Sequence, residues 1–569
     1  MHNFTDSITD LCETQWCCLV LLLSACFLVI ILPIYVGGLH SSGDLAVFLG
    51  FAEDFRSGLV SGDLFPGISD GKGGFGDLGI RFYPPLAPLL TAGIALLTHN
   101  MYDALWIFIL VFMFVGCLGV YLFVRDWGTP VLAACAGMLY AIVPFPLAKI
   151  YQFSLYAEFA AGSLVPFCFL FASRICRRRD WLDVVLFAVS FSLLILTHIP
   201  STVFTAISLF VYVMFIMDWR NIRWILTSLG VAAAAVLLAT SFYWIAILTE
   251  VSWLAHYKDE FSTGMYSFNF WLFPNLIPPG DVPVYYLPHF RNIDAMIVIS
   301  VLLILPSVVL WMGRRSWSKN VGWRTVLPVS FTALLALYMT TRASYFIWQV
   351  FPLLQKTQFP WRWLTVVSVL STIAFVLSLP HLWREFSSFR AVTGFFVVGL
   401  VVLIIGFDIR QSFARPNIIS RAEFQQMAND EFSARAWLPI WADSRAYDMP
   451  EKVIANDRSV EIVAWERKER HIIVADGAPM EMRVAAFYYP HWRATLNGQV
   501  VAVNKDENGV IVIPVGTGSA DVHLDFEEPQ LNRALSWLSM ISWPALGLAM
   551  LTRLCKRLHK WRIDTATRN

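Results

Sequence analysis

The chain has 569 residues, of which 57% are hydrophobic and only 15% are charged, and its mean hydropathy is +0.60. This composition excludes a soluble protein of that size, and a formal net charge of +1 gives no indication of a nucleic-acid partner. Long apolar runs recur from residue 17 to about residue 407, and ~20 helical residues cross ~30 Å of hydrocarbon. The sequence therefore predicts a polytopic α-helical membrane protein.

Twelve of the apolar runs are predicted to span the membrane. Lys and Arg concentrate in short cytoplasmic loops, and the Arg-rich stretch 174–179 lies inside only if the run 86–98 does not cross. That run is also too short to span, so we expect it to lie flat at the interface. Residues 37–102 and 249–292 then become long external loops. The predicted spans are 17–36, 103–124, 130–147, 158–174, 181–197, 201–217, 224–248, 293–312, 323–340, 361–380, 390–407 and 533–552.

The segment after the eleventh span has a different character. Charged residues become frequent, the apolar period shifts towards two, and the pairs Asn497-Gly498 and Asn508-Gly509 are typical of turns between strands. These features predict an extracytoplasmic β-sandwich, whose aromatic residues serve either glycan contact or core packing (Trp441, Tyr488, Tyr489 and Trp492). The expected domains are a transmembrane domain at 1–407, the β-sandwich at 408–530, and a final span with a basic cytoplasmic tail at 531–569.

An acidic stretch follows the first span, in the first external loop. Asp44 precedes apolar residues at helical spacing between Leu45 and Leu59, which predicts an amphipathic helix at the interface, and Asp54 follows within that helix. Asp44 is a helix cap in one interpretation and a catalytic carboxylate in the other. We favour the catalytic interpretation because further acids and a Tyr-Pro-Pro turn at Tyr83 share the loop.

A second acid, Glu158, begins an apolar span between Leu155 and Phe159. A carboxylate at this depth is costly to desolvate unless it is paired or bound to a metal, and this indicates a functional role. The alternative is that an acid at a helix N-terminus is favoured by the helix dipole. Both interpretations remain open at the level of sequence.

Several short motifs resemble two membrane-protein families. The acid after the first span, the Tyr83-Pro84-Pro85-Leu86 element and the acid in the second external loop resemble the GT-C superfamily of polyprenol-dependent glycosyltransferases. The stretches 358–362 (QFPWR), 437–441 (WLPIW) and 487–498 (FYYPHWRATLNG) resemble the YfhO-type proteins and the group named for a 6-pyruvoyl-tetrahydropterin synthase-related domain. The resemblance covers most of the chain.

This resemblance implies inverting transfer of a sugar from a polyprenyl-phosphate donor to a cell-envelope glycan, lipid or protein. The reaction would take place on the external face of a bacterial plasma membrane, with Asp44 as general base and Glu158 and Asp54 as further catalytic carboxylates. Cations must offset the charge of the departing phosphate. A divalent cation is possible, held by Glu158, Asp44 or His198. The candidates for binding the substrate and its phosphate are Arg81, Arg362, Tyr83, Lys72, His256 and Lys258.

Two other classes of function compete with the enzyme. One is a transporter or flippase for lipid-linked glycans, and the other is a non-catalytic envelope-assembly protein whose β-domain docks partners. The predicted spans carry ionisable residues only near their ends, such as Asp103, Glu158 and Asp294. This argues against ion-coupled transport, which places such groups near the middle of the membrane. It does not argue against a passive scramblase.

Overall fold

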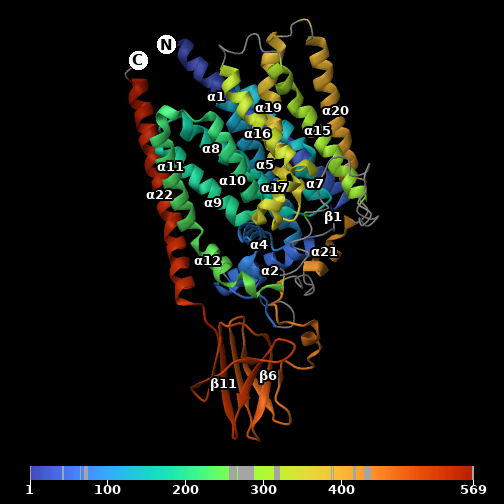
Figure 1. Cartoon of the computed structure of the whole chain (residues 1–569), viewed down its shortest axis with the longest axis vertical. Helices are drawn as coiled ribbons and strands as arrows, with labels where there is room; N and C mark the ends of the chain where they lie inside the picture. Colours follow the sequence, from blue (N-terminus) through green and yellow to red (C-terminus); the bar gives the residue numbers. More distant parts are fainter. Residues whose placement is uncertain are drawn as a thin grey trace.

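A bundle of long helices forms one end of the molecule and a two-sheet β-sandwich forms the other (Figure 1). Both chain termini lie at the end of the bundle that is far from the sandwich. The computed structural model describes residues 2–40, 44–63, 66–69, 75–255, 266, 287–312, 321–385, 388, 390–413, 418–428 and 437–566. Three predicted site residues, Lys72, His256 and Lys258, lie outside these described residues.

The helix bundle is that of a membrane protein. Within the described residues, ten helices are long and apolar enough to cross a membrane, which confirms the polytopic class. The predicted count of twelve is not confirmed, because the helix Trp181–Thr197 and the apolar part Thr325–Tyr338 of α16 are each shorter than 18 residues. The main helices are α1 (His2–Gly37), α5 (Met101–Arg125), α6 (Pro130–Ile142), α7 (Pro144–Tyr151), α8 (Tyr156–Arg177), α9 (Trp181–Thr197), α10 (Ile199–Ile216), α11 (Ile222–Ala239), α12 (Ser241–Glu250), α15 (Leu287–Met312), α16 (Val321–Tyr338), α19 (Leu364–Glu385), α20 (Arg390–Phe413) and α22 (Gln530–Ala566).

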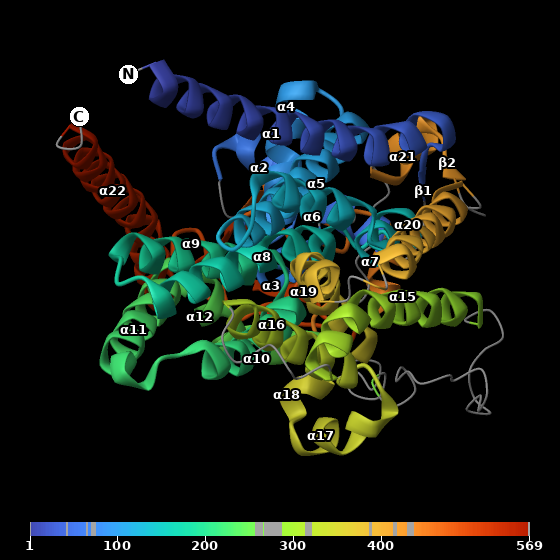
Figure 2. The ribbon, with the colours of Figure 1, turned by 90° about the horizontal axis from the view of Figure 1, so that it is seen from above.

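Helices α8 and α19 form the centre of the bundle, whereas α1 and α22 lie at its outside (Figure 2). Of the residues in the apolar stretch of α8, 89% are buried, whereas in that of α22 only 6% are buried. Small residues allow α5 to approach α8 closely, because a Cβ atom at Gly116 would lie 3.2 Å from the backbone of Ser163. This close packing fixes the first turn of α8, which carries Glu158, inside the bundle.

Short helices of the first loop lie between the bundle and the sandwich (Figure 1). Helix α2 (Leu45–Ser61) buries Phe48, Phe51 and Phe55 on one face, so the predicted amphipathic helix is confirmed. Asp44 precedes it, but its side chain makes no capping hydrogen bond. The capping interpretation of Asp44 therefore has no support in the geometry. Helices α3 (Gly79–Phe82) and α4 (Leu86–Thr98) complete this layer, and α4 packs against α2 and α5.

The sandwich consists of two antiparallel sheets that account for the predicted alternation. One has the strand order β3-β6-β10-β9 and the other β4-β5-β11-β7-β8. Asn497 and Gly498 join β7 to β8 with φ of 50° and 79°, the left-handed conformation that this pair favours. The strands are β3 (Val453–Ile454), β4 (Val460–Trp465), β5 (Glu469–Val474), β6 (Met480–Phe487), β7 (Trp492–Leu496), β8 (Gln499–Val501), β9 (Asn504–Lys505), β10 (Val510–Val515) and β11 (Ala520–Phe526).

The segment that follows α20 packs on the bundle rather than on the sandwich. Strand β2 (Ile418–Ile419) pairs with β1 (Leu39–His40) just before α2. Helix α21 (Arg421–Ala428) rests on α5, with the rings of Phe424 and Tyr102 5.2 Å apart. The sheets therefore begin later than the predicted domain boundary at residue 408.

The first loop also completes the core of the sandwich. Phe75 packs on Phe487 of β6 at 5.3 Å between ring centroids, and its carbonyl oxygen accepts a hydrogen bond from the Phe487 amide. The Leu78 amide donates to the hydroxyl of Tyr489 at 3.1 Å. Tyr489 and Trp492 are buried, so these two aromatics pack the core and are not a surface for glycan.

Candidate active site

A buried cluster of charges lies where the bundle meets the first-loop helices. We call Lys149, Glu158 and Arg362 the charged cluster. One oxygen of Glu158 lies 3.4 Å from the Lys149 ammonium, and the other lies 3.1 Å from Nε of Arg362. The Glu158 side chain is 1% exposed. A buried charge is tolerated only when it is paired, so the interpretation of Glu158 as a mere helix-dipole acid is insufficient.

Three separate segments of the chain position the charged cluster. Lys149 lies on α7, Glu158 lies in the first turn of α8, and Arg362 lies in the 3₁₀ turn Pro360–Trp363 that leads into α19. The hydroxyl of Thr365 links them, because it accepts from Lys149 at 2.7 Å and donates to Glu158 at 3.0 Å. The ammonium of Lys149 therefore already has its partners within the cluster.

Arg362 is held differently from Lys149. Its guanidinium lies 4.6 Å from the ring centroid of Phe359, and Nη1 donates to the carbonyl of Thr357 at 3.2 Å. No described residue accepts a hydrogen bond from its Nη2. Lys149 and Arg362 are thus two cations paired with the single carboxylate of Glu158. This local excess of positive charge favours the binding of an anion beside Arg362.

Asp44 lies between two residues that contact the chain just before Glu158. The hydroxyl of Ser154 donates to the carbonyl of His40 at 3.1 Å, and the rings of Phe48 and Tyr156 are 5.4 Å apart. These two contacts hold His40 and Phe48 against Ser154 and Tyr156, which lie just before Glu158 in the chain. The Asp44 residue is exposed, so its carboxylate is accessible to a substrate.

Tyr83 connects Asp44 with Arg362. Its ring stacks on Phe51 of α2 at 4.5 Å, and Trp437 contacts it edge-on at 6.0 Å. Burial raises the pKa of the Tyr83 phenol, the Asp44 carboxylate raises it further, and the Arg362 guanidinium opposes the rise. Both charges therefore act on one hydroxyl group. Of the predicted site residues, Glu158 and Arg362 are in contact, and Tyr83 lies within electrostatic range of Asp44 and Arg362.

His198 caps a helix beside the charged cluster. Its Nδ1 accepts from the Ser201 amide at 3.3 Å, at the start of α10. Burial lowers the pKa of this imidazole, and the charges of Arg362 and Lys149 lower it further. The same two cations would repel a divalent ion, so the geometry favours a capping role for His198, and its role as a metal ligand stays a prediction.

The residues do not fit the divalent cation that the resemblance allows. Both oxygens of Glu158 are paired with cations, and Asp44 is the remaining predicted carboxylate at this place. Of the described residues, no three His, Cys, Asp or Glu side chains gather here as a ligand set. We therefore propose no chemical step that uses a metal ion.

Two further predicted site residues have other partners. Arg81 binds Glu250 through Nε at 2.6 Å and Glu528 through Nη2 at 2.6 Å, and its Nη1 also contacts Glu528. Both oxygens of Asp54 accept from the Ser69 hydroxyl at 2.7 Å, and its carbonyl accepts from Arg467 of the sandwich. In the structure both residues connect the loop to neighbouring elements, and the roles of Arg81 as a phosphate ligand and of Asp54 as a catalytic acid stay predictions.

Lys149 is the residue that the sequence prediction missed. It lies nine positions before Glu158, in the same short connection between two spans, and is 1% exposed. The sequence could have indicated this pair, because Lys149 and Glu158 lie at the two ends of a short connection between spans, where opposite charges can meet. A lysine at the end of a span usually extends to the headgroups instead.

A large apolar cavity lies beside the charged cluster. It measures about 840 Å³ and is lined almost entirely by apolar side chains of α9, α10 and α11. Thr202, which lines it, donates its hydroxyl to the carbonyl of His198 at 3.0 Å. Phe210 and Leu226, also in the lining, are 68% and 61% exposed on the lipid-facing surface. The lining of the cavity therefore includes exposed apolar side chains and, at Thr202, a residue bonded to His198.

Comparison with protein families identifies the chain at the family level. Residues 80–414 match the family described as "6-pyruvoyl-tetrahydropterin synthase related domain; membrane protein". The match covers more than half of the chain and includes the charged cluster. The protein belongs to this family of membrane proteins. The family assignment confirms the predicted resemblance to that group, and no curated relative matches the chain.

Solved structures similar to this family member include two proteins with lipid ligands. The ArnT structure from Cupriavidus metallidurans bound to undecaprenyl phosphate is 15% identical, with 74% of this chain and 76% of that chain covered and a TM-score of 0.41. The oligosaccharyltransferase AglB from Archaeoglobus fulgidus, in complex with an inhibitory peptide and a dolichol-phosphate, is 14% identical, with coverage of 76% and 57% and a TM-score of 0.38. Both scores are below 0.5, so the proposals below rest on the residues of this chain.

Proposed function

We propose that this protein is a membrane glycosyltransferase of the GT-C type. It moves a sugar from a polyprenyl-phosphate donor to a cell-envelope acceptor at the end of the bundle that carries the sandwich. The observation that carries the proposal is the charged cluster, in which Lys149 and Arg362 exceed the charge of Glu158 next to the exposed Asp44. Sugar transfer from a phosphate requires a cation that offsets the charge of the leaving phosphate and a base that accepts the proton of the acceptor.

Arg362 is the residue that binds the donor phosphate. Its Nη2 is available for a phosphate oxygen, and the rings of Phe359 and Trp361 lie 4.6 and 5.9 Å from the guanidinium. Aromatic walls lower the local dielectric constant and therefore strengthen the attraction between the guanidinium and a phosphate. Lys149 adds positive charge from behind without contacting the phosphate, because Thr365 and Glu158 occupy its donors.

Asp44 is the general base. The carboxylate takes the proton of an acceptor hydroxyl or amine while the acceptor atom forms a bond to the anomeric carbon. The bond between that carbon and the phosphate oxygen breaks, and its electron pair leaves with the polyprenyl phosphate. The sugar is therefore inverted, and Arg362 offsets the negative charge on the leaving group.

Glu158 has a positioning role in this proposal. Its carboxylate is buried and paired at both oxygens, so it does not contact an acceptor. It holds the Arg362 guanidinium in place and keeps Lys149 charged inside the bundle. The apolar cavity of about 840 Å³ beside His198 accommodates part of the isoprenoid chain.

The test uses full-length protein in lipid nanodiscs with a panel of undecaprenyl-phosphate sugars and an envelope extract as acceptor. Transfer releases undecaprenyl phosphate, which mass spectrometry quantifies. Asp44→Asn should lower the rate by about 10²- to 10⁴-fold, as expected for loss of a general base. Glu53→Gln is the matched control, because Glu53 is a carboxylate of α2, the helix that follows Asp44, and it pairs with Arg56 on the surface of that helix. The control should retain the rate of the unchanged protein.

Equal rates for Asp44→Asn and the unchanged protein would overturn the assignment of the base. Lipid movement between leaflets, without any release of undecaprenyl phosphate, would replace the enzyme with the transporter alternative. The two results are separable because the first is measured as product and the second as accessibility of a labelled lipid.

A further inference from the structure

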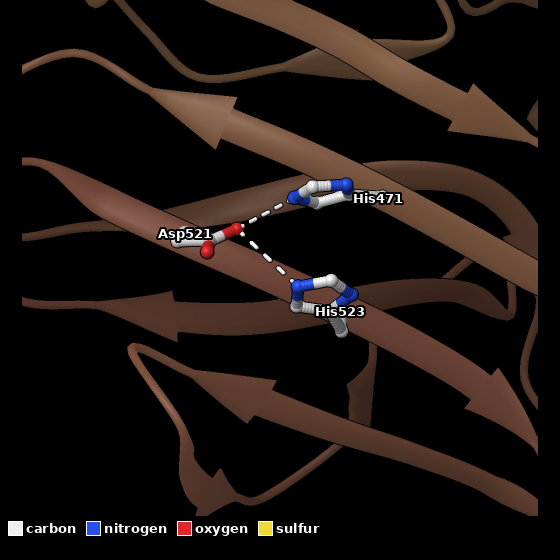
Figure 3. A group of neighbouring side chains, drawn as sticks. All are labelled: His471, Asp521 and His523. Atoms are coloured by element: carbon white, nitrogen blue, oxygen red, sulfur yellow. Dashed lines mark hydrogen bonds and ion pairs between the residues drawn. The ribbon is translucent and has the colours of Figure 1, made fainter.

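Three potential metal ligands gather on the outer face of the five-stranded sheet (Figure 3). His471 on β5 is directly opposite His523 on β11, and Asp521 lies two residues before His523. Because side chains alternate along a strand, Asp521 and His523 point to the same face. Their outer face is opposite to the buried Val522 and Leu524, so the group is open to solvent.

The three side chains converge on one point. The Oδ1 atom of Asp521 lies 2.7 Å from Nε2 of His471 and 3.5 Å from Nε2 of His523. The two imidazole rings are stacked with centroids 4.0 Å apart and an angle of 16° between their planes. Figure 3 shows that each ring turns a nitrogen towards the same carboxylate oxygen. Ligands of a tetrahedral Zn²⁺, with bonds of ~2.0–2.1 Å, are ~3.3 Å apart, and the two nitrogen–oxygen distances lie on either side of this value.

We propose that His471, Asp521 and His523 bind one divalent transition-metal ion, with Zn²⁺ as the reference ion. Two imidazoles and one carboxylate are a ligand set suited to zinc, copper and nickel. Within the part of the chain that the structure describes, this is the one group of three or more such side chains placed to hold an ion. The site is independent of the charged cluster and of the proposed transfer reaction.

Binding requires a change of tautomer and no change of backbone. The Nε2 lone pair of each histidine must face the ion, so the proton of each neutral ring resides on Nδ1. The hydrogen bond between His471 and Asp521 is replaced by two bonds to the ion. The His471, His523 and Asp521 side chains are 22%, 38% and 53% exposed, which leaves room for the rings to turn.

The surrounding charges favour a cation at this place. Asp525 lies two residues beyond His523 on the same face and pairs in register with Glu469 of β5. Arg493 of β7, opposite Asp525 on the other side, offsets one of these two charges. The ion would link β5 to β11 and keep at least one coordination position open to water or to a donor atom of another molecule.

The test measures zinc binding to the full-length protein in detergent after treatment with a chelator. Equilibrium dialysis against Zn²⁺ gives the stoichiometry and affinity, and Co²⁺ absorption reports the ligand geometry. His523→Gln and Asp521→Asn should each lower the affinity of one zinc equivalent by at least about tenfold. Asp525→Asn is the matched control, because it removes the same charge from the same face and strand without removing a ligand.

The proposal also predicts a stability effect that depends on the ion. Zn²⁺ should raise the unfolding temperature of the unchanged protein and of Asp525→Asn, but not that of His523→Gln. Equal zinc stoichiometry and affinity in the unchanged protein and in both ligand variants would overturn the proposal. So would a loss in Asp525→Asn equal to that in Asp521→Asn, since charge alone would then account for the binding.

Discussion

Two ionic groups, each with three charged residues, have opposite balances of charge in this protein. The charged cluster joins two cations to one carboxylate inside the bundle. At the junction with the sandwich, Arg81 joins two carboxylates, Glu250 and Glu528, and we call this group the junction tie. In the junction tie, Nε, Nη1 and Nη2 of Arg81 all contact carboxylate oxygens.

We infer from this difference that the ratio of cations to carboxylates, and not burial alone, distinguishes the proposed site from a structural tie. The junction tie has excess negative charge and a fully occupied guanidinium, so it offers a phosphate no attraction. The charged cluster has excess positive charge and an available guanidinium nitrogen on Arg362. Only the second arrangement is suited to an anionic substrate.

The largest expected effect is on stability, from Arg81→Ala. This change leaves Glu250 and Glu528 without their shared cation, and a broken buried ion pair costs about 3–5 kcal/mol. Thermal unfolding of the purified protein should show the loss. The control is Lys468→Ala, because its pair with Asp63 crosses the same junction at 34% and 31% exposure and contributes at most about 1 kcal/mol. Equal losses in the two variants would remove the distinction between the tie and a surface pair.

Arg362→Ala should have the second-largest effect, and the effect should be on transfer. Glu158 keeps Lys149 as its partner, so the fold should survive, whereas the transfer rate should fall about 10²- to 10³-fold. Release of undecaprenyl phosphate gives the rate and thermal unfolding gives the stability. Arg342→Ala, which removes an exposed arginine in a nearby connection, is the control. If Arg362→Ala lowered the unfolding temperature but left the transfer rate per folded molecule unchanged, Arg362 would be structural and the charged cluster would not be a phosphate site.

Acid should weaken the junction tie. Burial alone would raise the pKa of Glu250, but the hydrogen bond with His491 and the charge of Arg81 outweigh it and lower the pKa from 4.5 to about 2. The carboxylate therefore stabilises the fold fully above pH 4.5, and this contribution of about 3 kcal/mol is lost as the pH falls towards 2. Unfolding measured between pH 6 and pH 2 should show the loss in the unchanged protein and a smaller one in Glu250→Gln. A slope that is the same in both would assign the acid sensitivity to other groups.

The smallest effect is expected for Thr365→Val. The change removes the hydroxyl that joins Lys149 to Glu158, at a cost of about 1–2 kcal/mol in stability. The matched control is Thr372→Val on the same helix, where the hydroxyl donates only to the carbonyl of Ser368. Unfolding temperatures of the two variants give the comparison. If Thr372→Val costs as much, the link between Lys149 and Glu158 contributes nothing particular.

Elements with a strong local pattern could be predicted from the sequence. The period-two alternation after the eleventh span gave the two sheets of the sandwich, and the apolar spacing after Asp44 gave α2. In both cases the pattern reflects one face packed on a core, which neighbouring residues encode together. The number of spans was less predictable, because α9 is only 17 residues long.

The partners of charged residues could not be predicted in the same way. Arg81 meets Glu250 and Glu528 across 169 and 447 positions of sequence, and no local pattern specifies such a contact. Glu158 was recognised because a carboxylate in an apolar helix is anomalous by itself. Lys149 was missed because a lysine at the end of a span is ordinary until its partner is known.

The contribution of Phe75 and Leu78 to the sandwich core has a consequence for biosynthesis. The ribosome makes these residues about four hundred positions before Phe487 and Tyr489, which they contact. The first loop is therefore placed before its partners exist. Its apolar side chains stay exposed until the strands that cover them have been synthesised. During that interval the nascent chain needs protection, and a product that ends before residue 480 leaves the loop without its cover.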